Sequence, residues 1–77
     1  MKEKIEAKII EKENVIKSMN MELEEIKKGL KKITLDEYDI ESYIIKQCLK
    51  MKELKNTISN LQYEIYELMQ ILKADNK

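Results

Sequence analysis

This chain contains no proline, histidine, arginine, tryptophan or phenylalanine, and it has one glycine and one cysteine. Because proline is absent and glycine occurs once, little in the sequence interrupts a helix. A single cysteine, Cys48, cannot form an intramolecular disulfide, and the lack of histidine removes the usual Cys/His zinc sites. A chain of 77 residues is too short to bury a large core unaided. We therefore expect it to gain stability by oligomerisation.

The chain also lacks an excess of charge, since 15 lysines balance 15 acidic residues. A nucleic-acid partner is therefore disfavoured, because a basic excess neutralises phosphates and arginine is the usual reader of guanine. No apolar run approaches the roughly 18 residues of a membrane span, and no signal-peptide core is seen. We expect a cytoplasmic protein without a membrane partner, and a reduced Cys48.

What the chain does contain is apolar residues at alternating steps of three and four, the spacing of one stripe along a helix. They form two seams, which we call the first and the second seam. Lys12 interrupts the first seam and Gln47 the second, and such polar seam residues lower stability but select one register. The first seam is Ile5, Ile9, Lys12, Ile16, Met19, Leu23, Ile26, Leu30 and Ile33; the second is Ile40, Ile44, Gln47, Met51, Leu54, Ile58, Leu61, Ile65, Leu68 and Leu72.

A break separates the two seams. Gly29 can adopt the left-handed conformation that ends a helix, and Thr34 with Glu37 matches a capping box at the start of the next one. Ile33 and Tyr38 occupy the positions of a hydrophobic staple around that start. The sequence therefore predicts an all-α fold, a two-helix antiparallel hairpin of the coiled-coil type in a single domain. We expect helix 1 at about 3–29, a turn at about 30–34 and helix 2 at about 35–73; one helix continuing through Gly29 is the alternative.

A turn near residues 30–34 would leave the end of helix 2 without a partner. In that register Ile5 lies near Ser59, Ile16 near Cys48, and Lys12 near Glu53, so that residues after about 62 extend beyond helix 1. That overhang is too apolar for solvent, so we expect a homodimer of hairpins forming a four-helix bundle. The residues expected at the oligomer or partner interface are Ile58, Leu61, Tyr63, Ile65, Tyr66, Leu68, Met69, Ile71 and Leu72.

The sequence shows no constellation for catalysis, a cofactor or a metal. Cys48 lacks a histidine to activate it, and we expect a buried packing residue. The acidic residues Asp36, Glu37, Asp39 and Glu41 lack the EF-hand spacing, and capping of helix 2 is the expected role. Near the turn, Lys27, Lys28, Lys31 and Lys32 match the negative end of helix 1, although they also form a candidate anion or nucleic-acid contact.

These features predict a small non-enzymatic interaction protein that acts as a regulator, inhibitor or assembly factor on a larger protein. The abundance of Lys, Ile, Asn and Glu indicates an AT-rich genome, and a phage or mobile-element protein directed at host machinery, in the host cytoplasm, fits the size and composition. Two alternatives remain open. One is a nucleic-acid accessory protein that uses the lysine-rich turn, and the other is a non-catalytic subunit of a larger enzyme.

Overall fold

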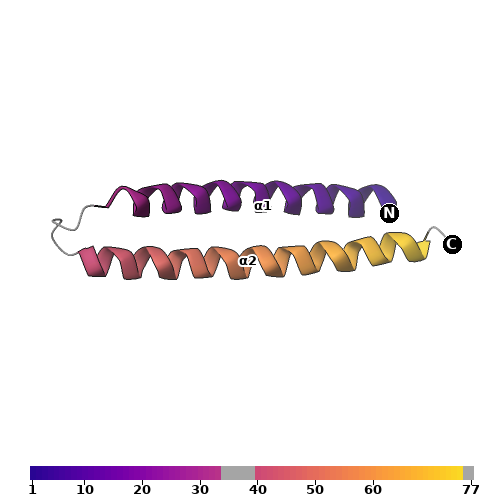
Figure 1. Cartoon of the computed structure of the whole chain (residues 1–77). Helices are drawn as coiled ribbons and strands as arrows, with labels where there is room; N and C mark the ends of the chain where they lie inside the picture. The colour runs from indigo at the N-terminus through magenta and orange to yellow at the C-terminus, as the bar shows by residue number, and fades with distance from the viewer. Residues whose placement is uncertain (34–39, 76–77) are drawn as a thin grey trace.

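The computed structural model describes residues 1–33 and 40–75, and its two helices confirm the all-α hairpin. Helix α1 runs from Lys2 to Lys31 and helix α2 from Ile40 to Asp75. The helices lie side by side in opposite directions, with the start of α1 and the end of α2 at the same end of the molecule (Figure 1). The result is a rod of 62 × 14 × 13 Å. The alternative of one continuous helix is therefore excluded.

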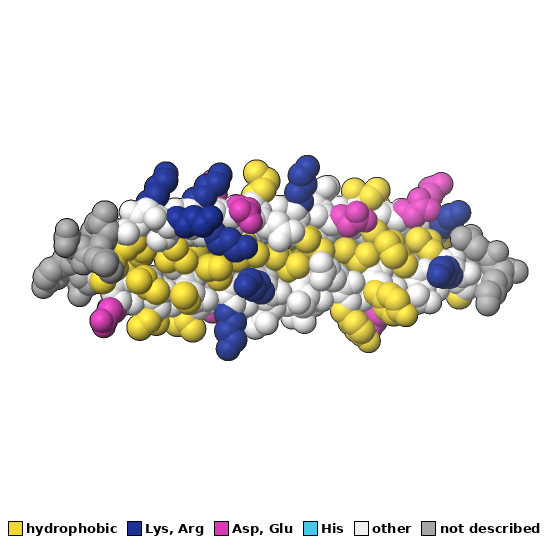
Figure 2. Space-filling view, viewed as in Figure 1, with side chains coloured by type: hydrophobic (Ala, Val, Ile, Leu, Met, Phe, Trp, Pro, Cys, Tyr) yellow, Lys and Arg dark blue, Asp and Glu magenta, His cyan; other side chains and the backbone are white. Residues whose placement is uncertain are grey.

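Burial follows the two predicted seams closely. Among the described residues, every seam member is buried or half-buried except Ile44, and Gly29 is the one other residue that is not exposed. Ile9, Leu23, Ile58 and Ile65 are the most deeply buried, with 6–9% of their surface exposed. A space-filling view shows the resulting apolar band along the junction of the two helices (Figure 2). The core of the molecule is thus this single seam.

The prediction that Gly29 ends helix 1 is wrong. Helix α1 continues two residues further, and the residue after it, Lys32, keeps a right-handed conformation with φ −90° and ψ −2°. The Lys32 amide donates to the carbonyl oxygen of Gly29 and the Ile33 amide to that of Leu30, which closes the helix. The capping box of Thr34 and Glu37, the staple residue Tyr38, Asp36 and Asp39 lie outside the described residues.

The predicted register between the helices is also wrong. Lys12 pairs with Glu64 and not with Glu53, Glu22 pairs with Lys50, and Gly29 lies beside Tyr43. The two residue numbers of each of these pairs add up to 72–76. A turn at 30–34 requires a sum of about 64. The physical reason is the position of the reversal. Because α1 extends to Lys31 and α2 is described from Ile40, the hairpin pivots several residues later than expected.

This later pivot removes the predicted overhang of helix 2. The last turns of α2 lie alongside the first turns of α1 (Figure 1). Ile65 is buried at 9% exposure, and Leu68 and Leu72 are half-buried. Both seams therefore pair along nearly their whole length. Any further apolar contact has to use a different face of the hairpin.

Candidate functional site

The hairpin leaves many large apolar side chains exposed. Four large hydrophobic residues of the described chain are buried and twelve are half-buried along the seam, whereas another twelve are exposed. Eight of these twelve lie in α2, namely Tyr43, Ile44, Ile45, Leu49, Tyr63, Tyr66, Met69 and Ile71. In Figure 2 apolar side chains gather over α2 at two places, one toward the turn and one toward the C-terminal end. The candidate site is therefore an interaction surface on α2.

The structure divides the predicted interface residues into two groups. Five belong to the seam and pack against α1: Ile58, Leu61, Ile65, Leu68 and Leu72. The other four are exposed: Tyr63 at 64%, Tyr66 at 59%, Met69 at 46% and Ile71 at 49%. The predicted register leaves residues after about 62 without an intramolecular partner, so it does not distinguish seam residues from outer residues in that segment. The four exposed residues are the ones still available for contacts with another chain.

An open groove runs between the helices near their free ends. We call it the distal groove. Leu61 and Leu68 contribute half-buried side chains to it, and Val15 and Ile71 add exposed ones from opposite helices. Sequence reasoning missed Val15, which lies just outside the first seam, because its neighbour across the groove depends on the register. The remaining lining residues are charged: Lys8, Glu11, Lys12, Glu64 and Glu67.

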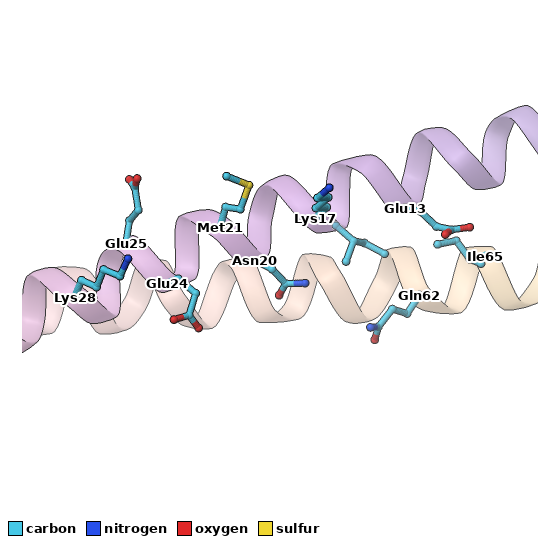
Figure 3. Close-up of a pocket in the computed structure, with 10 residues that line it drawn as sticks. Glu13, Lys17, Asn20, Met21, Glu24, Glu25, Lys28, Gln62 and Ile65 are labelled. Carbon is cyan, nitrogen blue, oxygen red and sulfur yellow. The ribbon is translucent and has the colours of Figure 1, made fainter.

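A second open groove lies on the middle of the hairpin (Figure 3). Most of its labelled residues come from α1, and Gln62 and Ile65 come from α2. Met21 and Glu25 point away from α2, whereas Asn20 lies beside it (Figure 3). Because charges of both signs line this groove, among them Glu13, Lys17, Glu24 and Lys28, it is a poor match for an apolar helix.

Two ion pairs connect the helices across the edges of the seam. Nζ of Lys12 lies 2.5 Å from Oε2 of Glu64, and Nζ of Lys50 lies 3.8 Å from Oε1 of Glu22. The Lys12 side chain is 28% exposed, whereas the other three are about half exposed, so each pair adds little stability. Their main effect is on register, because a shifted pairing separates both pairs.

Tyr63 is paired electrostatically within α2. The carboxylate of Glu67, one turn further along, favours the protonated Tyr63 phenol as a hydrogen-bond acceptor, and its negative charge disfavours the phenolate. Together these effects raise the pKa of Tyr63 above its ordinary value of 10.0. The phenol is therefore protonated throughout the physiological range. It presents a neutral aromatic ring with a hydrogen-bonding hydroxyl at the surface.

Cys48 is exposed, which overturns the expectation of a buried packing residue. It lies on the outer side of α2 in a surface depression with Met51, Lys52, Lys55 and Asn56. The prediction failed because it assumed a wide buried face at the start of helix 2, whereas one helix partner covers only the seam. Within residues 1–33 and 40–75, no cluster of three or more Cys, Asp or Glu side chains is arranged to hold a metal.

The four predicted anion-contact lysines, Lys27, Lys28, Lys31 and Lys32, are exposed on the last turns of α1 and just beyond. Basic side chains gather over this part of α1 in Figure 2. Acidic residues lie among them: Oε1 of Glu24 is 3.7 Å from Nζ of Lys27, and Glu25 lines the middle groove together with Lys28. The local charge is therefore partly neutralised within α1 itself.

Taken together, the fold and the exposed surface define a two-helix antiparallel hairpin of the coiled-coil type with unpaired apolar residues on its second helix. No helix of the described chain has both the length and the apolar character needed to cross a membrane. No protein-family model, curated protein or solved structure matches this chain. Its function is therefore argued from its own residues.

Proposed function

We propose that this chain is a small non-enzymatic protein–protein interaction module. It acts as a homodimer of hairpins and works as a regulator, inhibitor or assembly factor by occupying a surface on a larger protein. A phage or mobile-element protein directed at host machinery in the host cytoplasm fits this role. The observation that carries the proposal is that twelve large hydrophobic residues of the described chain are exposed, eight of them on α2. Exposed apolar area of this extent on so small a protein is typical of an interaction site.

The contact residues of the module are the exposed members of the predicted interface, Tyr63, Tyr66, Met69 and Ile71. Tyrosine supplies a large contact area with few rotatable bonds, and it is enriched among the residues that dominate binding energy. Methionine adapts to irregular partner surfaces. Burying each of these side chains on a partner contributes on the order of 1.5–3 kcal/mol before ordering costs. This role needs no catalytic group, in keeping with a chain that has no histidine and no arginine.

Site-specific photo-crosslinking in cells of the source organism tests this proposal. A photoreactive residue is placed at position 71 of α2 and, as the matched control, at Asn14, which is exposed on α1. The expected result is an adduct with a larger protein from 71 that is absent from 14. The partner, once identified and purified, should bind the hairpin directly, and Ile71→Asp should weaken binding about tenfold, equivalent to about 1.4 kcal/mol. Only self-adducts from 71, or equal adducts from both positions, would overturn target binding.

A nucleic-acid accessory role is the second candidate, favoured by the exposed lysines at the end of α1. Titration of duplex DNA and of RNA at low salt, repeated at higher salt, tests it. An affinity that falls steeply with salt and is lost in Lys28→Glu/Lys31→Glu would establish this role, because phosphate contacts release counterions. No binding at low salt would exclude it. A subunit of a larger enzyme, the third candidate, would appear as an enzyme among the crosslinked partners.

A further inference from the structure

The outer face of α2 carries a second stripe with the same alternating steps as the seam. Its members are Ser42, Ile45, Leu49, Lys52, Asn56, Ser59, Tyr63, Tyr66 and Gln70, and every one is exposed. We call it the outer stripe. Only Lys52 among them is charged, although charged residues make up 39% of the chain. A solvated helix face in such a chain would carry more charge. A stripe with a single charged residue and with steps of three and four is typical of a helix that packs against another helix.

The apolar residues of the outer stripe form two separate groups with a polar centre between them. Ile45 and Leu49 lie toward the turn, at 60% and 58% exposure, and Tyr63 and Tyr66 lie toward the free end, at 64% and 59%. The two groups are arranged almost symmetrically about Asn56. Leu49 and Tyr63 are each 7 residues from it, while Ile45 and Tyr66 are 11 and 10 residues away.

This symmetry matches a two-fold axis perpendicular to α2 at Asn56. A second copy running antiparallel would bring its Tyr63 to the level of Leu49, and its Tyr66 to the level of Ile45. A two-fold contact requires one patch to be complementary to itself, and the outer stripe satisfies that requirement. Residues 42–70 span about 42 Å of helix, long enough for several turns of continuous contact.

Charges beside the outer stripe select the antiparallel orientation. Lys46 and Glu67 are exposed and lie 10 and 11 residues on either side of Asn56. In the antiparallel arrangement Lys46 of each copy meets Glu67 of the other. A parallel arrangement in register would instead set Lys52 of one copy against Lys52 of the other, and it would leave Lys46 and Glu67 of the two copies on opposite edges of the contact. Electrostatic complementarity therefore favours the antiparallel form.

We propose that the outer stripe of α2 docks against the same stripe of a second copy of this chain, antiparallel, with the two-fold axis at Asn56. This inference rests on the proposed interaction module and specifies its self-association. The two α2 helices then lie inside a four-helix assembly and the two α1 helices outside. Ile71 and Val15 belong to the distal groove and not to the outer stripe, so they remain open to the larger protein.

Cysteine crosslinking distinguishes the orientations, because the chain has one natural cysteine. Cys48 lies 8 residues from the proposed axis. The two copies of Cys48 are therefore about 24 Å apart along an antiparallel dimer, but at the same level in a parallel one. Position 56 lies on the axis, so Cys48→Ser/Asn56→Cys brings two thiols together. The matched control is Cys48→Ser/Asn14→Cys, with its thiol on the exposed side of α1. Each protein is treated with a short bismaleimide after its solution mass and helicity have been measured.

The expected result is a dimeric mass for all three proteins and on the order of tenfold more covalent dimer from position 56 than from Cys48 or position 14. Equal crosslinking through Cys48 would overturn the antiparallel orientation. A dimeric mass without crosslinking at position 56 would overturn the outer stripe as the interface. A monomeric mass at every concentration would overturn self-association. None of these results alters the test for a larger partner, which depends on adducts from position 71.

Discussion

At the scale of single residues, Lys12 shows how the structure accommodates a polar residue in an apolar seam. Its side chain extends along the seam to Glu64, so the ammonium group keeps a partner and contact with solvent while the aliphatic part is half-buried. The pair links residues 52 positions apart in the sequence. It therefore favours this register over shifted alternatives, although its contribution to stability is small.

Exchanging the charges of this pair tests its role. We expect Lys12→Glu to lower the free energy of unfolding by about 1 kcal/mol, because two carboxylates then face each other at the seam. Adding Glu64→Lys should recover most of that loss. Urea unfolding followed by circular dichroism measures both, with Lys17→Glu on the middle groove as a control. A double variant no more stable than Lys12→Glu alone would show that the two residues do not interact.

The pKa of Tyr63 is a second property of single residues. Because Glu67 raises it above 10.0, we expect the Tyr63 phenolate to form at a higher pH than the phenolate of an ordinary tyrosine. Folding favours the protonated phenol, so the small stabilisation is present below about pH 10 and is lost as pH rises through the raised pKa. Spectrophotometric titration of Tyr63 in a variant with the other tyrosines replaced by phenylalanine measures the pKa. Glu67→Gln should lower it toward its ordinary value, and an unchanged titration would contradict this assignment.

At the scale of the helices, Gly29 lies inside α1 and not at its end. The reason is that Leu30 and Ile33 continue the first seam beyond the glycine, and packing of Leu30 on α2 offsets the roughly 1 kcal/mol that a helical glycine costs. A Cβ at this position would lie 3.5 Å from the Tyr43 hydroxyl oxygen, an ordinary van der Waals distance. The backbone and the space around Gly29 therefore both accept a larger residue.

We expect Gly29→Ala to stabilise the hairpin by about 0.5–1 kcal/mol through its higher helix propensity. The measurement is the midpoint of thermal or urea unfolding. Replacing Ser18, exposed in the middle of the same helix, by alanine provides a propensity control without the glycine. Destabilisation by Gly29→Ala would mean that this residue needs a conformation that alanine cannot adopt.

The contrast between the two faces of α1 gives another prediction at this scale. Leu23 is 6% exposed, whereas Met21, two residues earlier, is 64% exposed. We expect Leu23→Ala to cost about 2–5 kcal/mol, because it opens a cavity in the seam. Met21→Ala should change stability by no more than about 0.5 kcal/mol. Urea unfolding of the two variants provides the comparison, and equal effects would contradict the assignment of the core.

At the scale of the whole molecule, the hairpin is a pair of helices with one seam and no further layer. This arrangement leaves the outer stripe of α2 exposed. It separates residues that hold the hairpin together from residues that we propose to join two hairpins. Ile65 is buried in the seam, whereas its sequence neighbour Tyr66 is exposed on the outer stripe.

Substituting these neighbours should separate folding from association. Ile65→Asp buries a charge in the seam, so we expect most of the helical signal to be lost. Tyr66→Asp leaves the seam intact, so the helical signal should remain while the solution mass falls toward the monomer. Circular dichroism and light scattering across a dilution series measure the two effects. A folded monomer of Ile65→Asp, or a fully dimeric Tyr66→Asp, would contradict this division.

The seams themselves could be predicted from the sequence, because a helix places residues three and four apart on one face whatever lies opposite. The register between the two helices could not be predicted. It depends on where the chain reverses, and helix caps locate a helix end only to within a residue or two. Moving the pivot from about 32 to between 36 and 38 shifts every pair and changes the partner of Lys12 from Glu53 to Glu64.

The division of the predicted interface residues into buried and exposed ones also depends on the register. Ile65 and Tyr66 are both apolar neighbours in one segment, and only the position of α1 shows that the first is covered and the second is not. By itself the sequence determined the helical class, the pairing faces and the absence of histidine and arginine chemistry, because these follow from residue type and local spacing. The tertiary structure decided the register, the burial of the end of α2 and the exposure of Cys48, because each depends on contacts between residues far apart in the chain.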